Sequence, residues 1–354
     1  MEAKVEDIVI AGTRIAPGET RTLDLPVANL YTHGALNMPL RVVRGQQAGP
    51  SLFVNAALHG DEINGVEIIR RLLRLRALKR LRGTLLAAPV VNVFGFVGHS
   101  RYLPDRRDLN RSFPGSEKGS LAARLAHLFM REVVSNATHG VDLHSGSVHR
   151  SNLPQVRANL QQAGVKRMAE AFGAPVILDS PAREGSLRAA VLERGIPLIV
   201  YEGGEAFRFD EESIRSGLRG LVNVMFSLGM LELGKTKRPA SPTLWAKSSS
   251  WVRAPESGVL RDPIALGARV REGEVVGRIG DPFGENVVEV QAHISGIVIG
   301  RLNLPLVSEG DAIFHIAQLA RESDAQGAIE DPQTEVYTSP ALPVPDQEEY
   351  EGWA

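Results

Sequence analysis

Apolar residues in the middle of the chain follow two alternating patterns. Short apolar runs bounded by Gly or Pro predict buried strands, and longer runs with apolar residues three and four positions apart predict helices. The predicted strands are Leu52–Ala57, Leu85–Val91, Gly140–His144, Ala174–Leu178 and Pro197–Glu202. The predicted helices are Ile63–Leu81, Leu121–Val134, Val165–Phe172, Ser186–Arg194 and Glu211–Leu231. This alternation predicts an α/β domain, in which a mixed sheet carries helices on both faces.

The pattern changes on either side of this region. Residues 1–50 alternate weakly and predict edge strands of the same domain, so we expect the first domain to cover residues 1–233. A basic stretch with Pro and Ser, 234–250, predicts a linker. Short β runs then predict a small all-β domain over 251–320. Residues 321–354 are acidic and Pro-containing, which is typical of a tail without a core of its own.

The predicted β domain contains an internal repeat. Val252–Leu260 returns as Val290–Val298, and Val270–Ile279 returns as Val307–Ile316. Such a repeat predicts two interlocked halves, and it resembles the barrel-sandwich domains of biotinyl and lipoyl carriers. Those carriers attach their cofactor to a lysine, and 251–320 contains none, so we expect a structural or oligomerising role instead.

Two histidines of this domain, His293 and His315, lack ligand-type neighbours at suitable spacing. We therefore expect both to pack in the domain or to lie on its surface. No metal site is predicted for this part of the chain.

Composition narrows the range of functions. The 354 residues include 40 basic and 41 acidic ones, so the chain has no basic field for nucleic acid or an anionic membrane, and we expect neither partner. The chain has no cysteine, so any metal site must use His and carboxylate ligands. The first residues lack a signal-peptide pattern and the apolar runs are too short to span a bilayer, so we expect a cytoplasmic protein.

Candidate chemistry first occurs where a predicted strand meets a predicted helix. Asn55–Gly65 places His59 and Glu62 there, three residues apart, where two side chains can converge on one ion. A neutral imidazole and a carboxylate suit Zn²⁺, which needs a third ligand and an open position for water. The pair is weak evidence alone, because His139 and Asp142 have the same spacing.

Two later strands also end on residues that can bind or orient a metal. One apolar run ends on His144, and Asp142, two residues earlier, could orient its imidazole. Another run ends on Glu202, and Glu205 follows it closely. Each residue alone could simply be solvated or hydrogen-bonded. Their occurrence at successive strand ends favours a shared site, because ligands of α/β sheets gather there.

A long connection between elements, Gly98–Gly115, carries Arg101, Asn110 and Arg111. Connections of this length are usually functional or disordered, and the aromatic, Pro and Leu content of this one favours function. An arginine beside an amide is suited to bidentate recognition of a carboxylate. We therefore expect a substrate with a free carboxylate near its scissile bond. An ion pair of Arg111 with Asp105 or Asp108 is the structural alternative.

The ordered set of H-x-x-E, D-L-N-R, D-L-H-S and Y-E-G-G resembles the succinylglutamate desuccinylase and aspartoacylase family, relatives of the zinc carboxypeptidases. The resemblance covers about residues 50–233. It implies a zinc carboxypeptidase-like fold and one zinc ion per chain, held by His59, Glu62 and His144. The other implied roles are general base for Glu202, polarisation of the scissile carbonyl for Arg101, and binding of a substrate carboxylate for Asn110 and Arg111.

These observations predict a zinc-dependent hydrolase that removes the acyl group from an N-acyl amino acid or a related small amide. One alternative is a metallocarboxypeptidase that acts on peptide C-termini, since the same metal site could serve a more open cleft. Another is a zinc-binding protein without turnover. Glu205 is the alternative to Glu202 as the base.

Overall fold

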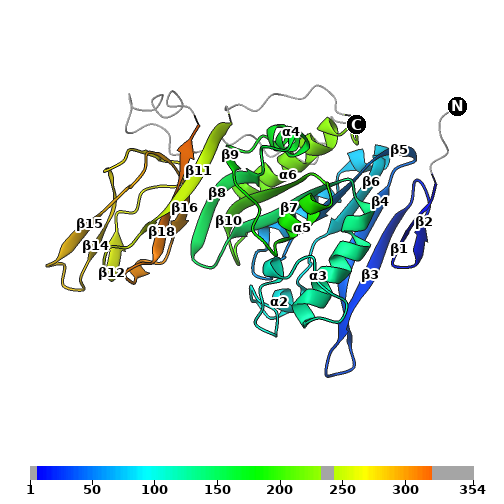
Figure 1. Cartoon of the computed structure of the whole chain (residues 1–354), viewed down its shortest axis with the longest axis horizontal. Coiled ribbons are helices and arrows are strands. Elements are labelled where there is room, and N and C mark those ends of the chain that lie inside the picture. The colour runs from blue at the N-terminus through cyan, green and yellow to red at the C-terminus, as the bar shows by residue number, and fades with distance from the viewer. Residues whose placement is uncertain (1–5, 233–242, 321–354) are drawn as a thin grey trace.

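The computed structural model describes residues 6–232 and 243–320, and its main element is a mixed sheet of 12 strands (Figure 1). The central strands are β5 (Gln47–Asn55), β6 (Arg82–Ala88), β7 (His139–Gly146), β8 (Arg150–Ala158), β9 (Val176–Asp179) and β10 (Leu198–Glu205). One edge is formed by β3 (Thr20–Asn29) and β4 (Ala35–Arg44), with a separate hairpin of β1 (Ile8–Ile10) and β2 (Thr13–Ile15). Strands β6, β5, β7 and β10 are parallel, whereas β8 is antiparallel to β10.

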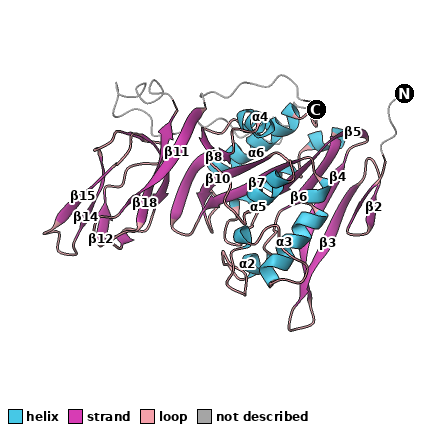
Figure 2. Cartoon of the chain, in the orientation of Figure 1, coloured by secondary structure: helices cyan, strands magenta, loops and turns pink. Residues whose placement is uncertain are grey.

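Helices lie on both faces of this sheet, as expected (Figure 2). The α-helices are α1 (Asn64–Leu72), α2 (Val93–Val97), α3 (Leu121–Glu132), α4 (Ala163–Phe172), α5 (Leu187–Glu193) and α6 (Glu211–Ser227). The short 3₁₀ helices are η1 (Arg76–Arg80), η2 (Leu109–Arg111) and η3 (Val134–Asn136). Capping hydroxyl or carboxylate groups of Ser120, Ser186 and Asp210 start α3, α5 and α6 by accepting backbone N–H bonds.

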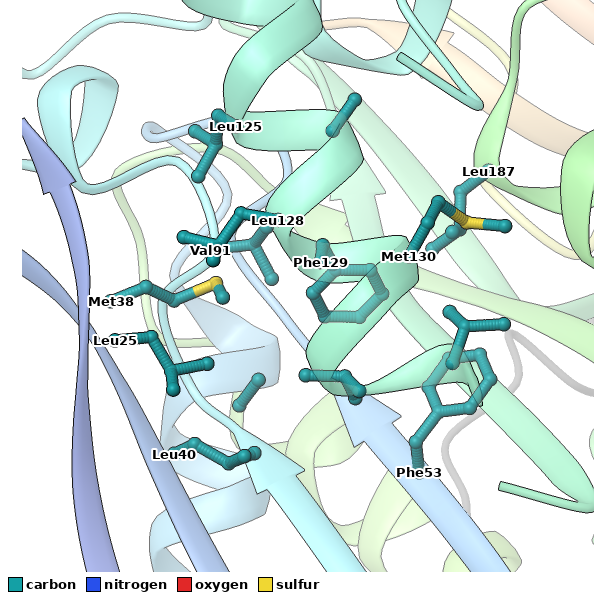
Figure 3. Packing of buried hydrophobic residues seen from close by; sticks show 14 of the residues in the cluster. Leu25, Met38, Leu40, Phe53, Val91, Leu125, Leu128, Phe129, Met130 and Leu187 are labelled. Carbon is teal, nitrogen blue, oxygen red and sulfur yellow. The ribbon is translucent and has the colours of Figure 1, made fainter. Parts of the chain in front are cut away.

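The period-two alternation of the strands divides their side chains between two cores. In β5, Phe53 belongs to the core shared with α3 and α5, whereas Leu52 and Val54 belong to the core shared with α1, α4 and α6. Figure 3 shows the first of these cores, where Phe53 meets Phe129 edge-on with ring centroids 5.9 Å apart. The face that carries α3 and α5 is also the face to which the site residues of β7 and β10 project.

The C-terminal described segment consists of strands and continues the main sheet. Strand β11 (Leu244–Arg253) pairs with β9, and β16 (Gly296–Leu302) pairs with β8. The sheet is completed by β13 (Arg269–Val270) and β18 (Ala312–Leu319). A second sheet of four strands comprises β12 (Gly258–Arg261), β14 (Val275–Gly280), β15 (Val287–Gln291) and β17 (Leu306–Val307), and it lies at one end of the molecule (Figure 1).

The repeated segments exchange short strands between these two sheets. Strand β13, from the first repeat, pairs with β16 in the main sheet, and β17, from the second repeat, pairs with β12 in the small sheet. Each half of the repeat therefore contributes one short strand that pairs with a strand of the other half. We call residues 244–319 the β unit.

Two expected boundaries are corrected by the structure. Residues 244–250, expected in the linker, form the start of β11, because Leu244 to Ala246 pair with β9. The helix expected over Ile63–Leu81 ends at Leu72 and a 3₁₀ turn follows, which lets Leu78 and Leu81 turn back into the core of α1. The acidic tail lies outside the described residues. None of the described helices is long and apolar enough to cross a membrane.

Truncation after Glu232 tests how far the first part of the chain depends on the β unit. Removing residues 233–354 would leave β9 without its partner β11 and β8 without β16, and would expose the apolar side chains of Leu153, Val176 and Leu178. Unpaired strand edges next to apolar surface favour association. We expect the truncated protein to aggregate in size-exclusion chromatography. A monodisperse truncated protein with an unchanged melting temperature would contradict this.

Candidate active site

Three ligand-type side chains meet at the carboxyl ends of β5 and β7. The ligand atoms of His59, Glu62 and His144 all lie within 4.8 Å of one another, and all three residues are buried. The two oxygens of Glu62 divide between the imidazoles, because Oε1 lies 2.7 Å from His59 Nδ1 and Oε2 lies 2.7 Å from His144 Nδ1. Two imidazole nitrogens and a carboxylate that converge on one position suit a divalent metal ion with an open coordination position.

The turn between β5 and α1 shapes this cluster. Glu62 N–H donates to the His59 carbonyl at 3.1 Å, which folds the two side chains toward each other. Gly60 lies in this turn directly against the backbone of α2, since a Cβ there would come within 1.9 Å of the Gly95 carbonyl carbon. A side chain at position 60 would therefore displace the metal-site turn.

Aspartates hold the far nitrogen of each imidazole. His144 Nε2 lies 2.9 Å from Asp142 Oδ2, and Asn55 Nδ2 donates to the other oxygen of Asp142 at 2.7 Å. His59 Nε2 lies 3.2 Å from Asp108 Oδ1. A carboxylate at this position fixes the ring orientation and directs the opposite nitrogen, Nδ1, to the metal.

The electrostatics of the cluster favour a cation. Burial opposes the charge of Glu62, but His59 and His144 more than offset it and hold the Glu62 pKa well below its usual range. Burial likewise opposes charge on the two histidines, yet Glu62 and the flanking aspartates raise the pKa of both. Protons therefore compete with a metal ion for these nitrogens, so metal binding should weaken as the pH falls.

Arg101 connects the long loop to this cluster. Its guanidinium lies 3.3 Å from Glu62 Oε1 and 3.1 Å from Asp108 Oδ2. Asn110 uses its side-chain oxygen to accept the Leu187 N–H of α5 at 2.9 Å. The Arg111 side chain donates to the Asn110 carbonyl, and among the described residues it forms no ion pair with Asp105 or Asp108.

Glu202 and Glu205 have different surroundings although both lie on β10. Glu202 aligns with His144 in the parallel pair of β10 and β7, and it lines the same cavity. Glu205 instead accepts hydrogen bonds from the His149 N–H at 3.1 Å and from Asn303 Nδ2 at 2.8 Å, and it does not line that cavity. The local geometry thus favours Glu202 for contact with a bound molecule.

The cavity has a volume of about 740 Å³, and its lining includes Arg101, Asn110 and Arg111 of the long loop, Asp142 and His144 of β7, and Glu202 of β10. The β unit contributes the part of the cavity wall that contains Ser249, Trp251 and His315. The rings of Trp251 and His315 stack with centroids 4.5 Å apart. Burial and the nearby Arg157 cation lower the pKa of His315 to about 3, so this wall is uncharged at neutral pH.

Several site residues were not predicted from the sequence. The expectation that His315 only packs in the β domain missed its place in the cavity wall. Asp108 was considered only as a partner of Arg111, although it holds both His59 and Arg101. Its position directly before Leu109, Asn110 and Arg111 in the D-L-N-R motif was the available signal.

The sequence of this chain is similar to one known protein family and to a named deacetylase. Residues 48–228 match the sequence profile of the succinylglutamate desuccinylase/aspartoacylase catalytic domain. The chain is 30% identical over 312 residues to N-alpha-acetyl-L-2,4-diaminobutyric acid deacetylase from Halomonas elongata, which covers 84% of this chain and 90% of that protein.

Solved structures give the same result. The product-bound ectoine utilization protein EutE (DoeB) from Ruegeria pomeroyi has a TM-score of 0.76 and 28% identity, over 84% of this chain and 95% of that one. A succinylglutamate desuccinylase/aspartoacylase from Rhodobacter sphaeroides has a TM-score of 0.75 and 26% identity, over 85% and 96%. The similarity therefore extends beyond residues 48–228.

Metal analysis of histidine variants tests the cluster. Purified protein should hold about one divalent ion per chain, because three ligands form a site with one open position. His59→Ala and His144→Ala should each abolish metal retention, and Asp142→Asn should weaken it by about 10- to 100-fold. His139→Ala is the matched control, since His139 begins the same strand that carries His144. Elemental analysis of folded variants that retain metal after either ligand substitution would refute the assignment.

Proposed function

Because the chain belongs to the succinylglutamate desuccinylase/aspartoacylase family, we propose that it is a zinc-dependent hydrolase that removes the acyl group from an N-acyl amino acid or a related small amide. The observation that carries the proposal is the meeting of His59, Glu62 and His144 in a cavity that Arg101 and Glu202 also line. The donor set of two imidazoles and one carboxylate is a common zinc site of hydrolases.

The roles of the side chains follow from their chemistry. A zinc ion held by His59, Glu62 and His144 would polarise the scissile carbonyl and lower the pKa of a water molecule. Glu202 would take a proton from the attacking water and pass it to the leaving amine. Arg101 would donate N–H bonds to the oxygen on which negative charge develops, a contribution of about 3 to 4 kcal/mol in other enzymes.

The cavity also supports a small, acidic substrate. Its volume of about 740 Å³ is within the usual range for small-molecule sites. Six arginines but only three carboxylates line it, which favours bound groups of negative charge. Asn110 and Arg111 would hold the substrate carboxylate, since both residues line the cavity.

The alternatives differ in what the cavity must admit. A carboxypeptidase needs a cleft open to a peptide chain, whereas here the β unit narrows the space by adding Ser249 and Trp251 to the cavity wall. A protein that only binds zinc needs no base, and Glu202 would then be dispensable. Turnover of a panel of N-acyl amino acids and short peptides by zinc-loaded protein distinguishes all three functions. The panel should include N-alpha-acetyl-L-2,4-diaminobutyric acid, which the name of the Halomonas elongata relative specifies.

Substitution of the proposed base tests the mechanism. Glu202→Gln keeps the shape of the side chain but cannot accept the proton, so we expect kcat to fall by about 100-fold or more while bound zinc is retained. Glu205→Gln is the matched control on the same strand and should leave kcat within about twofold of the unmodified protein. The opposite pattern in steady-state kinetics would transfer the role to Glu205.

The carboxylate site is tested by an exchange of one cation for another. Arg111→Lys keeps the charge but loses the planar fork, so KM for N-acyl amino acids should rise, by an amount worth about 1.5 to 3 kcal/mol. The value of kcat should change little. If the unmodified enzyme hydrolyses the amidated or esterified forms of a good substrate equally well, Arg111 does not recognise the carboxylate.

A further inference from the structure

Glu202 is held through only one of its two oxygens. Asn152 Nδ2 donates to Glu202 Oε2 at 2.7 Å, and Arg157 Nη2 lies 3.1 Å from the same oxygen. Among the described residues, the other oxygen, Oε1, accepts no hydrogen bond. Asn152 and Arg157 both come from β8, the strand antiparallel to β10, and all three side chains line the cavity.

We propose that Asn152 and Arg157 are positioning residues that fix the Glu202 carboxylate and leave Oε1 as the atom that accepts the proton. The inference rests on the proposed function, because it takes Glu202 as the base. A carboxylate with a hydrogen bond and an ion pair on one oxygen is restrained in rotation about its terminal torsion angle, which is otherwise broad. Restraint matters because a displacement of about 1 Å at a catalytic group can cost on the order of 100-fold in rate.

Strand β16 of the β unit holds in place the strand that carries Asn152, because it pairs with β8. Asn152 pairs with Gly300 of β16, and a Cβ on Gly300 would lie 3.1 Å from Asn152 Oδ1. Glycine at position 300 thus leaves room for the Asn152 amide, whose nitrogen faces Glu202. In the same strand pair, Gln155 Nε2 donates to the Ile299 carbonyl at 3.2 Å. Strand β8 is therefore fixed from both sides, by β10 and by β16.

Arg157 could instead bind the substrate, and kinetics distinguishes this role from the positioning of Glu202. If Arg157 bound the substrate carboxylate, its loss would mainly raise KM. If it positions Glu202, its loss lowers kcat, because the contact acts on the chemical step and not on substrate binding.

The test is steady-state kinetics of zinc-loaded variants on the best substrate of the panel. Arg157→Gln should lower kcat by about 10- to 100-fold with KM within about twofold. Asn152→Leu should lower kcat by about 10-fold, and Arg157→Lys should restore most of the loss. Arg208→Gln is the matched control, because it removes an arginine that pairs with Glu205, which does not line the cavity. A higher KM with unchanged kcat in Arg157→Gln would overturn the proposal.

A double-mutant cycle shows whether the two residues act together. Adding Arg157→Gln to Glu202→Gln should cause no further loss of kcat, because the residue that it positions is already inactive. Losses that multiply would overturn the positioning role and leave the proposed function intact.

If the unmodified protein hydrolyses no member of the panel, the proposed function fails, and a crystal structure of the Arg157→Gln protein decides the positioning role alone. A Glu202 side chain that has moved supports the role. A Glu202 side chain in its original place overturns it.

Discussion

The site depends on the placement of Glu62 between two imidazoles. Each of its oxygens lies 2.7 Å from one histidine, and all three side chains are buried. Burying such groups is costly unless each is paired, and here Asp108 and Asp142 bind the far nitrogens while Arg101 contacts Glu62. The cluster thus connects the turn after β5, the end of β7 and the long loop, three segments far apart in the sequence.

The sequence predicted those parts of the fold that follow from a pattern of residues near one another in the chain. Apolar period and strand-end position located β5, β7 and β10 and placed His59, Glu62, His144 and Glu202 at their ends. Strand β8 was missed because its sequence, RSNLPQVRA, is polar and contains a proline. It is a strand because it lies between partner strands, and three of its polar residues, Arg150, Asn152 and Arg157, line the cavity. Asp108 was missed for a related reason, since its role is defined by two contacts across the fold.

The β unit shows why a domain boundary is hard to read from composition. Its repeat and the absence of lysine from residues 251–320 were visible in the sequence, and both indicated a module separate from the chemistry. Sheet pairing instead makes the β unit part of the domain that carries the site, because β11 and β16 continue the main sheet. Trp251 and His315 of the β unit also line the cavity. Such contacts depend on which edges meet, and no local pattern of residues specifies that choice.

The unbroken sheet also restricts how the protein can open. Many enzymes built from two parts admit substrate by bending at a hinge between them. Here a rotation of the β unit against the first part of the chain would break the backbone ladders of β9 with β11 and β8 with β16, and would displace Trp251 and His315 from the cavity wall. Any widening of the cavity therefore depends on the loops around it, and these include the long connection that carries Arg101 and Arg111.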